Sequence, residues 1–214
     1  MRATSTDVLL LVDKPARSQN EIYIGKAVPP PTSEQWPALE VAITLLGGNF
    51  SARLTRELRS KRGWTYGVEA RRLRNHEASL FYVWTFTAPD RALDSIELVL
   101  AELELLASNG PTPAEFERAR GYTKGRLILS TDTPATLARE AGRSARFGLG
   151  PHAIERRMRE LDELQGEDVV RVFAGLLAPH DLGIVMVCSA EHFGEAMGRL
   201  NGVVEVATEA YDAD

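Results

Sequence analysis

The sequence feature that most constrains the fold is a pair of strand-like runs followed by a long helical block. Residues 65–73 and 79–87 are rich in β-branched and aromatic side chains, and the polar residues 74–78 between them can turn the chain. We therefore predict an antiparallel hairpin. Alternation along its second strand puts Phe81 on one face and Trp84 on the other, so both faces are expected to be covered at least in part.

Other segments complete the pattern. Short apolar or β-branched runs predict strands at 8–12, 21–24 and 182–188. Helical spacing and start signals predict helices at about 33–46, 51–61, 93–109, 113–130, 134–147, 154–160, 167–177 and 190–200. Thr32 or Ser33 is expected to cap the first of these helices, with Gln35 closing a capping box on Thr32. We predict one α+β domain over residues 1–214, with a largely antiparallel sheet covered by helices and closed by the strand at 182–188.

Composition excludes several classes of protein. The 214 residues carry 25 basic and 30 acidic side chains, and this net charge of -5 argues against general binding to nucleic acid or other polyanions. No apolar run reaches the length of a membrane span, and the N-terminus lacks the pattern of a signal peptide. We therefore expect a soluble protein without a membrane partner, in the cytoplasm or the periplasm. The single cysteine allows no internal disulfide.

Metal and nucleophile motifs are weak. A catalytic zinc needs about three protein ligands, and no two of the histidines at 76, 152, 180 and 192 lie close together in sequence. His76-Glu77 begins like H-E-x-x-H, but Leu80 occupies the place of the second histidine. Cys188 and His192 imitate an inverted motif, although a strand and a helix would separate them. We predict no metal site and no cofactor in this chain.

One basic segment stands out. Eight cations fall between residues 53 and 74, opposed by Glu57 and Glu69, with Trp64 and Tyr66 among them. Such a cluster is compatible with a solvated helix face beside a hairpin, and also with a patch that binds phosphates and stacks bases. The acidic chain and the absence of a nucleic-acid motif favour the first interpretation, so no nucleic-acid partner is predicted.

The same segment carries a family resemblance. Residues 45–67 read LLGGNFSARLTRELRSKRGWTYG, which resembles the pattern L-G-G-x-x-x-S-R-L-x-x-x-L-R-E-x-x-G-L-x-Y of the M16 zinc metallopeptidase family, in its C-terminal domain. The flanking runs LVDKPARSQ at 11–19, ERARGYTKG at 117–125 and GIVMV at 183–187 agree with this domain, so the similarity covers nearly the whole chain. The resemblance implies the α+β fold shared by LuxS and the mitochondrial processing peptidase.

The resemblance also implies which residues act. In this family the zinc motif H-x-x-E-H lies in a separate N-terminal domain, whereas the C-terminal domain supplies an arginine and a tyrosine seven residues apart. Arg59 and Tyr66 occupy these positions and are the candidate catalytic residues. A tyrosine hydroxyl and an arginine fork can stabilise the oxyanion that forms when a peptide carbonyl is attacked. Arg56 and Trp64 are candidate substrate-binding residues. Trp64, where leucine is commoner, could line the substrate channel or wedge under the helix.

The resemblance therefore predicts a zinc-free, substrate-binding and transition-state-stabilising domain of an M16-type peptidase. Its expected partners are the zinc-binding domain, on the same chain or another subunit, and a peptide substrate. The chain is expected to be a piece of a longer two-domain subunit and to be inactive alone, and an isolated domain of this kind is a candidate homodimer. The alternative is a non-catalytic assembly module, like the core subunits of respiratory complexes that resemble this family.

Overall fold

The computed structural model describes residues 7–30, 32–193 and 203–210. The described elements follow one another along the chain in the order β1 (Asp7–Asp13), β2 (Asn20–Val28), α1 (Trp36–Gly47), η1 (Thr55–Lys61), β3 (Val68–Leu73), β4 (Ser79–Thr87), η2 (Pro89–Arg91), α2 (Ala92–Asn109), α3 (Pro113–Leu129), α4 (Pro134–Arg146), α5 (Ala153–Glu163), α6 (Gly166–Gly175), β5 (Gly183–Cys188), η3 (Ala190–His192) and β6 (Val203–Ala210). The predicted α+β class is confirmed.

The strands form one six-stranded sheet in the order β3-β4-β2-β5-β1-β6. The pairs β3–β4, β4–β2 and β2–β5 are antiparallel, whereas β1 pairs in parallel with both β5 and β6. The sheet is therefore largely antiparallel, as predicted. The late strand β5 does not add at an edge but lies between β2 and β1, which follow each other in sequence.

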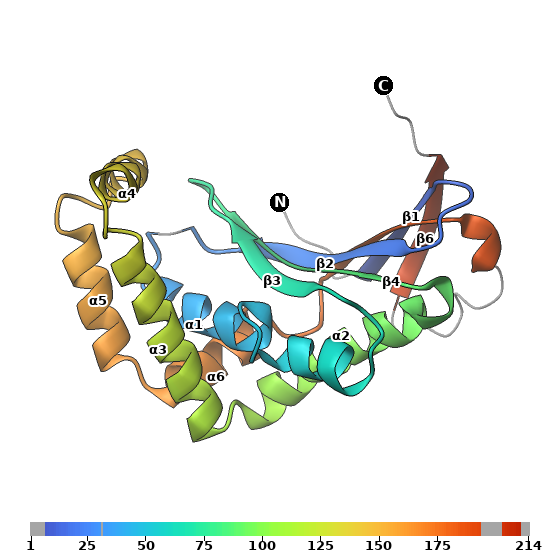
Figure 1. The fold of residues 1–214 in the computed structure, drawn as a ribbon, viewed down its shortest axis with the longest axis horizontal. Helices are drawn as coiled ribbons and strands as arrows, with labels where there is room; N and C mark the ends of the chain where they lie inside the picture. Colours follow the sequence, from blue (N-terminus) through green and yellow to red (C-terminus); the bar gives the residue numbers. More distant parts are fainter. Residues whose placement is uncertain (1–6, 31, 194–202, 211–214) are drawn as a thin grey trace.

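Helices cover one face of this sheet. Figure 1 shows α1, α2, α3, α5 and α6 on the same side of the strands, with α4 standing apart near the tip of β3. Phe81 and Val83 of β4 are fully buried on the covered side, while Trp84 and Phe86 on the other face are half-buried. Alternation along β4 thus separates the main core from a partly open aromatic face.

The helix α1 lies at the centre of the core. Each of its twelve residues is buried, and its last residue, Gly47, packs so closely on β3 that an added Cβ would approach the Ala70 backbone nitrogen to 2.5 Å. The capping prediction is wrong: the helix begins at Trp36, and Gln35 is an N-cap without a side-chain hydrogen bond. A turn in which Trp36 N–H donates to the Ser33 carbonyl precedes the helix, so Thr32 lies too far away to cap it.

The caps of the later helices agree with the sequence. The Thr112 hydroxyl accepts from the Glu115 N–H at the start of α3, and the Glu115 carboxylate accepts from the Thr112 N–H. Thr133 begins α4 in the same way. Within the predicted helix at 190–200 the structure describes one short 3-10 turn, η3, and residues 194–202 lie outside the described residues. The strand β6 was not predicted.

Candidate functional site

The segment between α1 and β3 positions the predicted catalytic pair. Leu54 and Leu58 are fully buried and anchor this segment to the core. Residues Thr55–Lys61 wind as a π-helix, a rare conformation that is often associated with functional sites. Gly63 then takes a φ of 65°, which favours glycine, and the chain reverses toward β3.

Arg59 and Tyr66 converge across this turn. The guanidinium carbon of Arg59 lies 4.5 Å from the centre of the Tyr66 ring and 5.3 Å from that of Phe50. Tyr66 is 77% exposed and Phe50 is 82% exposed, so two rings flank one cation at the surface. The turn at Gly63 thus brings Arg59 and Tyr66 together, while the catalytic role of the pair remains a prediction.

The backbone around Tyr66 is fixed on both sides. The buried Thr65 hydroxyl accepts from the Gly67 N–H at 3.0 Å and donates to the Gly67 carbonyl at 2.8 Å. The same carbonyl accepts from the Thr85 hydroxyl of β4 at 3.0 Å. These bonds end the loop before β3, which begins at Val68 and not at the predicted residue 65. Tyr66 is therefore an exposed side chain on an anchored loop.

The other cations of the basic segment have carboxylate partners. Glu57 pairs with Lys61 at 2.6 Å and with Arg62 at 2.8 Å. The remaining pairs join Arg53 to Glu102 and Glu115, Arg56 to Glu57 and Glu115, Arg71 to Glu69, and both Arg72 and Arg74 to Glu40. Of the eight cations, Arg59 is the one without a carboxylate partner among the described residues. The basic segment is thus mostly an ion-pair network and not a free positive patch.

Arg56 and Trp64 take different positions. Arg56 has a side chain that is 43% exposed, and its guanidinium lies 3.5 Å from both Glu57 and Glu115. Trp64 is half-buried against the core, with the guanidinium carbons of Arg62 and Arg91 at 5.4 and 5.8 Å from its ring. Trp64 is therefore partly packed against the core, and its substrate-binding role remains a prediction.

Arg53 was not singled out by sequence, and it connects this segment to α3. Its Nε and Nη2 donate to the two carboxylate oxygens of Glu115 at 3.0 and 2.8 Å. Burial alone would raise the pKa of Glu115, but Arg53 and the Thr112 donors hold this pKa at about 2. The Arg53 side chain is buried and the Glu115 side chain is 10% exposed, and the bidentate pair fixes the start of the basic segment against α3.

The described residues contain no set of side chains that could serve as zinc ligands. Over residues 7–30, 32–193 and 203–210, no three His, Cys, Asp or Glu side chains gather closely enough to hold a metal ion. Cys188 is fully buried in β5, where burial and the nearby Asp13 carboxylate raise the pKa of its thiol to about 11. A thiol in this environment is a poor nucleophile and metal ligand. His76 packs on the Phe147 ring at 4.9 Å.

Comparison with known proteins now identifies the family. The profile described as peptidase M16 inactive domain matches residues 3–121, which is more than half of the chain. An uncharacterized zinc protease of Mycobacterium bovis is 30% identical over 178 residues, which cover 83% of this chain and 40% of that protein. This chain belongs to the peptidase M16 family and is similar to its inactive C-terminal domain.

Solved structures share the fold. A peptidase M16 inactive domain from Pseudomonas fluorescens superposes with a TM-score of 0.78 at 22% identity, covering 98% of this chain and 46% of that one. A protease from Helicobacter pylori gives the same TM-score of 0.78 at 19% identity, covering 85% and 44%. The chain therefore spans less than half the length of these relatives. Its described helices include none that is long and apolar enough to cross a membrane.

Sequence analysis missed two features. Phe50 also contacts Arg59, and its place next to Gly47-Gly48-Asn49 was the available signal. Outside this site, Glu40 collects Arg72 of β3, Arg74 directly after β3 and Arg157 of α5, and no local pattern could reveal this long-range cluster.

Proposed function

We propose that this chain is the zinc-free, substrate-binding and transition-state-stabilising domain of an M16-type zinc metallopeptidase. Residues 1–214 would form one domain of a subunit whose other domain carries H-x-x-E-H. The observation that supports this most is the state of Arg59, which alone in its basic segment has no carboxylate partner among the described residues. A cation held by aromatic rings and left without a counter-charge is available to a ligand.

The geometry suits a peptide. Tyr66 lies two residues before β3, and β3 is an edge of the described sheet. An extended peptide can pair with an exposed strand edge through its main chain, and along β3 it would pass beside the Tyr66 hydroxyl. The Tyr66 hydroxyl and the Arg59 fork would then donate to the substrate carbonyl as negative charge develops on its oxygen. The hydrolytic chemistry itself belongs to the second domain.

Supporting roles are proposed for Trp64 and Arg56. The accessible part of Trp64 would contact a substrate side chain next to Tyr66. Arg56 would offer its exposed guanidinium edge to the peptide while it remains paired with Glu57 and Glu115. Both residues would contribute to binding and not to charge stabilisation. Arg56→Ala is therefore expected to raise KM with little change in kcat.

The central test is kinetic and uses the complete enzyme, in which this chain is combined with its zinc domain. Arg59→Ala and Tyr66→Phe are each expected to lower kcat/KM by about 10²–10³, the usual effect of removing one oxyanion donor. Lys61→Ala is the matched control, because this exposed cation of the same helix pairs with Glu57. Its kcat/KM should stay within about twofold of the wild type, consistent with a surface ion pair.

The result that would reject this function is equal kcat/KM for the wild type, Arg59→Ala and Tyr66→Phe. If the complete assembly also lacks peptidase activity, the non-catalytic assembly module becomes the better explanation. The 214-residue chain alone is expected to bind no stoichiometric zinc and to cleave no peptide. Elemental analysis and a chelator-controlled peptidase assay on the pure chain check both statements.

A further inference from the structure

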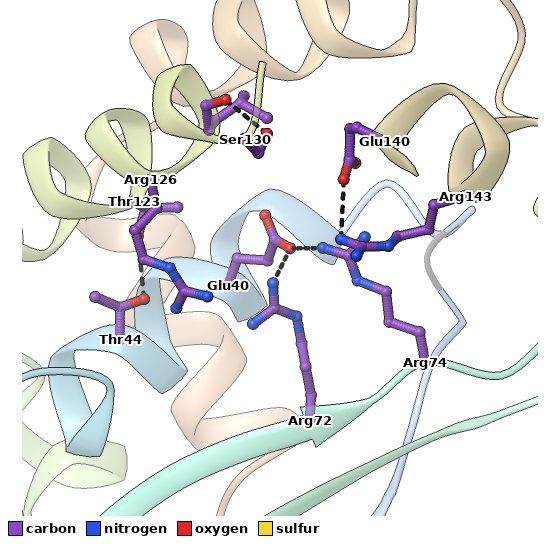
Figure 2. Close-up of a pocket in the computed structure, with 10 residues that line it drawn as sticks. Glu40, Thr44, Arg72, Arg74, Thr123, Arg126, Ser130, Glu140 and Arg143 are labelled. Carbon is purple, nitrogen blue, oxygen red and sulfur yellow. Dashed lines mark hydrogen bonds and ion pairs between the residues drawn. The ribbon is translucent and has the colours of Figure 1, made fainter. Parts of the chain in front are cut away.

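A polar cavity lies on the helix-covered side of the sheet, at the far end of β3. Its volume is about 90 Å³, and it opens to solvent. Figure 2 shows side chains from α1, α3, α4 and the end of β3 directed into it. The charged residues of its wall are Glu40, Arg72, Arg74, Arg126, Glu140 and Arg143.

Glu40 organises one side of the cavity. Its buried carboxylate pairs with Arg72, with Arg74 at 2.7 Å and with Arg157 at 3.1 Å, and it accepts from the Trp36 indole N–H at 3.2 Å. Burial alone would raise the pKa of Glu40, but the surrounding arginines hold this pKa at about 2. The carboxylate is therefore ionised at neutral pH and keeps Arg72 and Arg74 beside the cavity.

The wall nevertheless carries an excess of positive charge. Four arginines face two glutamates, which leaves two positive charges without a counter-charge, and Arg157 behind Glu40 is matched by Glu160 at 3.3 Å. Glu140 is already paired with Arg143 at 2.9 Å. Arg126 has no carboxylate partner among the described residues, and Figure 2 shows it pointing toward Glu40 and Arg72.

Two further observations indicate that the arginines of the cavity wall lack a hydrogen-bond acceptor or a counter-charge. The Arg72 Nε is buried and has no hydrogen-bond partner within the described part of the chain. Burial lowers the pKa of Arg74 despite its contact with Glu40, and repulsion from Arg72 and Arg157 lowers it further. Crowded, partly desolvated guanidinium groups are stabilised by an added anion, which supplies both charge and acceptor oxygens.

We propose that this cavity binds a phosphate group, either free or as the end of a small monoester. A phosphate carries about 1.5 to 2 negative charges at neutral pH and so matches the two excess positive charges of the wall. Its oxygens suit the planar forks of Arg72 and Arg126, whereas a carboxylate brings a single charge. The open side of the cavity leaves room for the rest of an ester.

The site is separate from the Arg59–Tyr66 pair. Tyr66 lies before β3 and Arg74 lies after it, so the two are eight positions apart along mostly extended chain, roughly 26 Å at the usual rise of a strand. The phosphate proposal therefore does not depend on the peptidase function. Its test measures binding alone, and either proposal can fail without the other.

The experiment is calorimetric titration of the 214-residue chain with inorganic phosphate and with phenyl phosphate at constant ionic strength, with acetate as the monoanion control. We expect saturable binding of one phosphate with a dissociation constant of about 1 mM or lower, and weaker binding of acetate. Tighter binding of phenyl phosphate would identify a monoester as the ligand. Equal affinities would identify free phosphate.

Three variants separate a site from a general charge effect. Arg126→Gln, an exposed side chain without a carboxylate partner in the described chain, should weaken phosphate binding about tenfold or more. Glu140→Gln removes a negative charge from the wall and should tighten binding. Arg139→Gln changes a residue of α4, the helix that also carries Glu140, but one outside the cavity wall. This variant should leave phosphate binding unchanged.

Several results would overturn the proposal. Heat that does not saturate, or acetate binding as tight as phosphate, would show that the cavity has no phosphate site. Equal losses in Arg126→Gln and Arg139→Gln would show that only net charge matters. Weaker phosphate binding in Glu140→Gln would mean that the excess positive charge of the cavity wall does not drive binding. Circular dichroism of each variant ensures that these comparisons are made between folded proteins.

Discussion

Arg53 and Arg59 lie six residues apart in one basic segment and have opposite environments. Arg53 is buried and makes a bidentate ion pair with Glu115 on α3. Arg59 has no carboxylate partner among the described residues and contacts the exposed rings of Tyr66 and Phe50. The guanidinium of Arg53 has its hydrogen-bonding capacity used by the fold, whereas no described carboxylate uses that of Arg59.

The difference shows how to separate stability from function among similar cations. A buried, paired arginine has been desolvated during folding, and its loss leaves a carboxylate without its partner. An arginine on aromatic faces keeps its donors directed outward, because the rings contact the plane of the guanidinium and not its N–H edge. The comparison can be tested one residue at a time.

The largest expected effect is on stability. Arg53→Ala should lower the free energy of unfolding by about 3 kcal/mol, because Glu115 would remain buried without its main partner. Arg56→Ala is the control: this arginine also contacts Glu115, but its side chain is 43% exposed, so the loss should stay below about 1 kcal/mol. Urea denaturation of the three proteins measures both values. Equal losses would show that burial does not distinguish these arginines.

Acid should weaken the ion pair between Arg53 and Glu115, whereas the contact between Arg59 and the Tyr66 ring contains no carboxylate. The pKa of Glu115 falls from 4.5 to about 2 in the folded chain, so its pairing stabilises the fold above pH 4.5 and this contribution is lost as pH falls toward 2. Glu40 acts in the same direction over the same range. Unfolding measured between pH 6 and pH 2.5 should therefore show a smaller pH-dependent loss in Glu115→Gln than in the wild type. Parallel curves would contradict the pairing.

A smaller effect is expected at the turn that joins Arg59 to Tyr66. Gly63→Ala should cost about 1–2 kcal/mol, because alanine disfavours a φ of 65° although nothing lies within 4 Å of an added Cβ. Gly121→Ala is the matched control. It also meets no atom within 4 Å, but it lies in α3, where alanine should stabilise by up to about 1 kcal/mol. Thermal unfolding of both variants tests whether backbone conformation alone accounts for the difference.

The smallest effect on stability is expected at Arg59 itself. Arg59→Ala should change the free energy of unfolding of this chain by less than about 1 kcal/mol, the size of an exposed cation–π contact. A loss as large as that of Arg53→Ala would mean that Arg59 is structural. The contrast between a stable fold and the expected loss of kcat/KM in the complete enzyme is what a ligand-directed arginine should produce.

Local patterns predicted most of the elements. The capping box at Thr112, the hairpin of β3 and β4 and the helices of the second half follow from side chains close in sequence. The convergence of Arg59 and Tyr66 was also within reach, since the two are only seven positions apart and a glycine lies between them. Their proposed role came from the family resemblance and not from the residues alone.

Other features depend on contacts between distant parts of the chain. The basic segment could not be recognised as an ion-pair network, because Glu40, Glu102 and Glu115 come from three other helices. The π-helical winding of Thr55–Lys61 has no clear sequence signal. The position of β5 between β2 and β1 also depends on pairing between strands that lie far apart in sequence.

The central position of β5 has a consequence for synthesis of the protein. Every residue of β1, β2, β3 and β4 leaves the ribosome before β5, yet β1 has no described sheet partner earlier than Gly183. The hairpin and β2 can assemble early, while β1 must wait for about 170 further residues before it can join the sheet. The sheet is therefore expected to be completed only after β5 has been synthesised, and a nascent chain stalled at residue 121 should leave β1 accessible to chaperones and proteases.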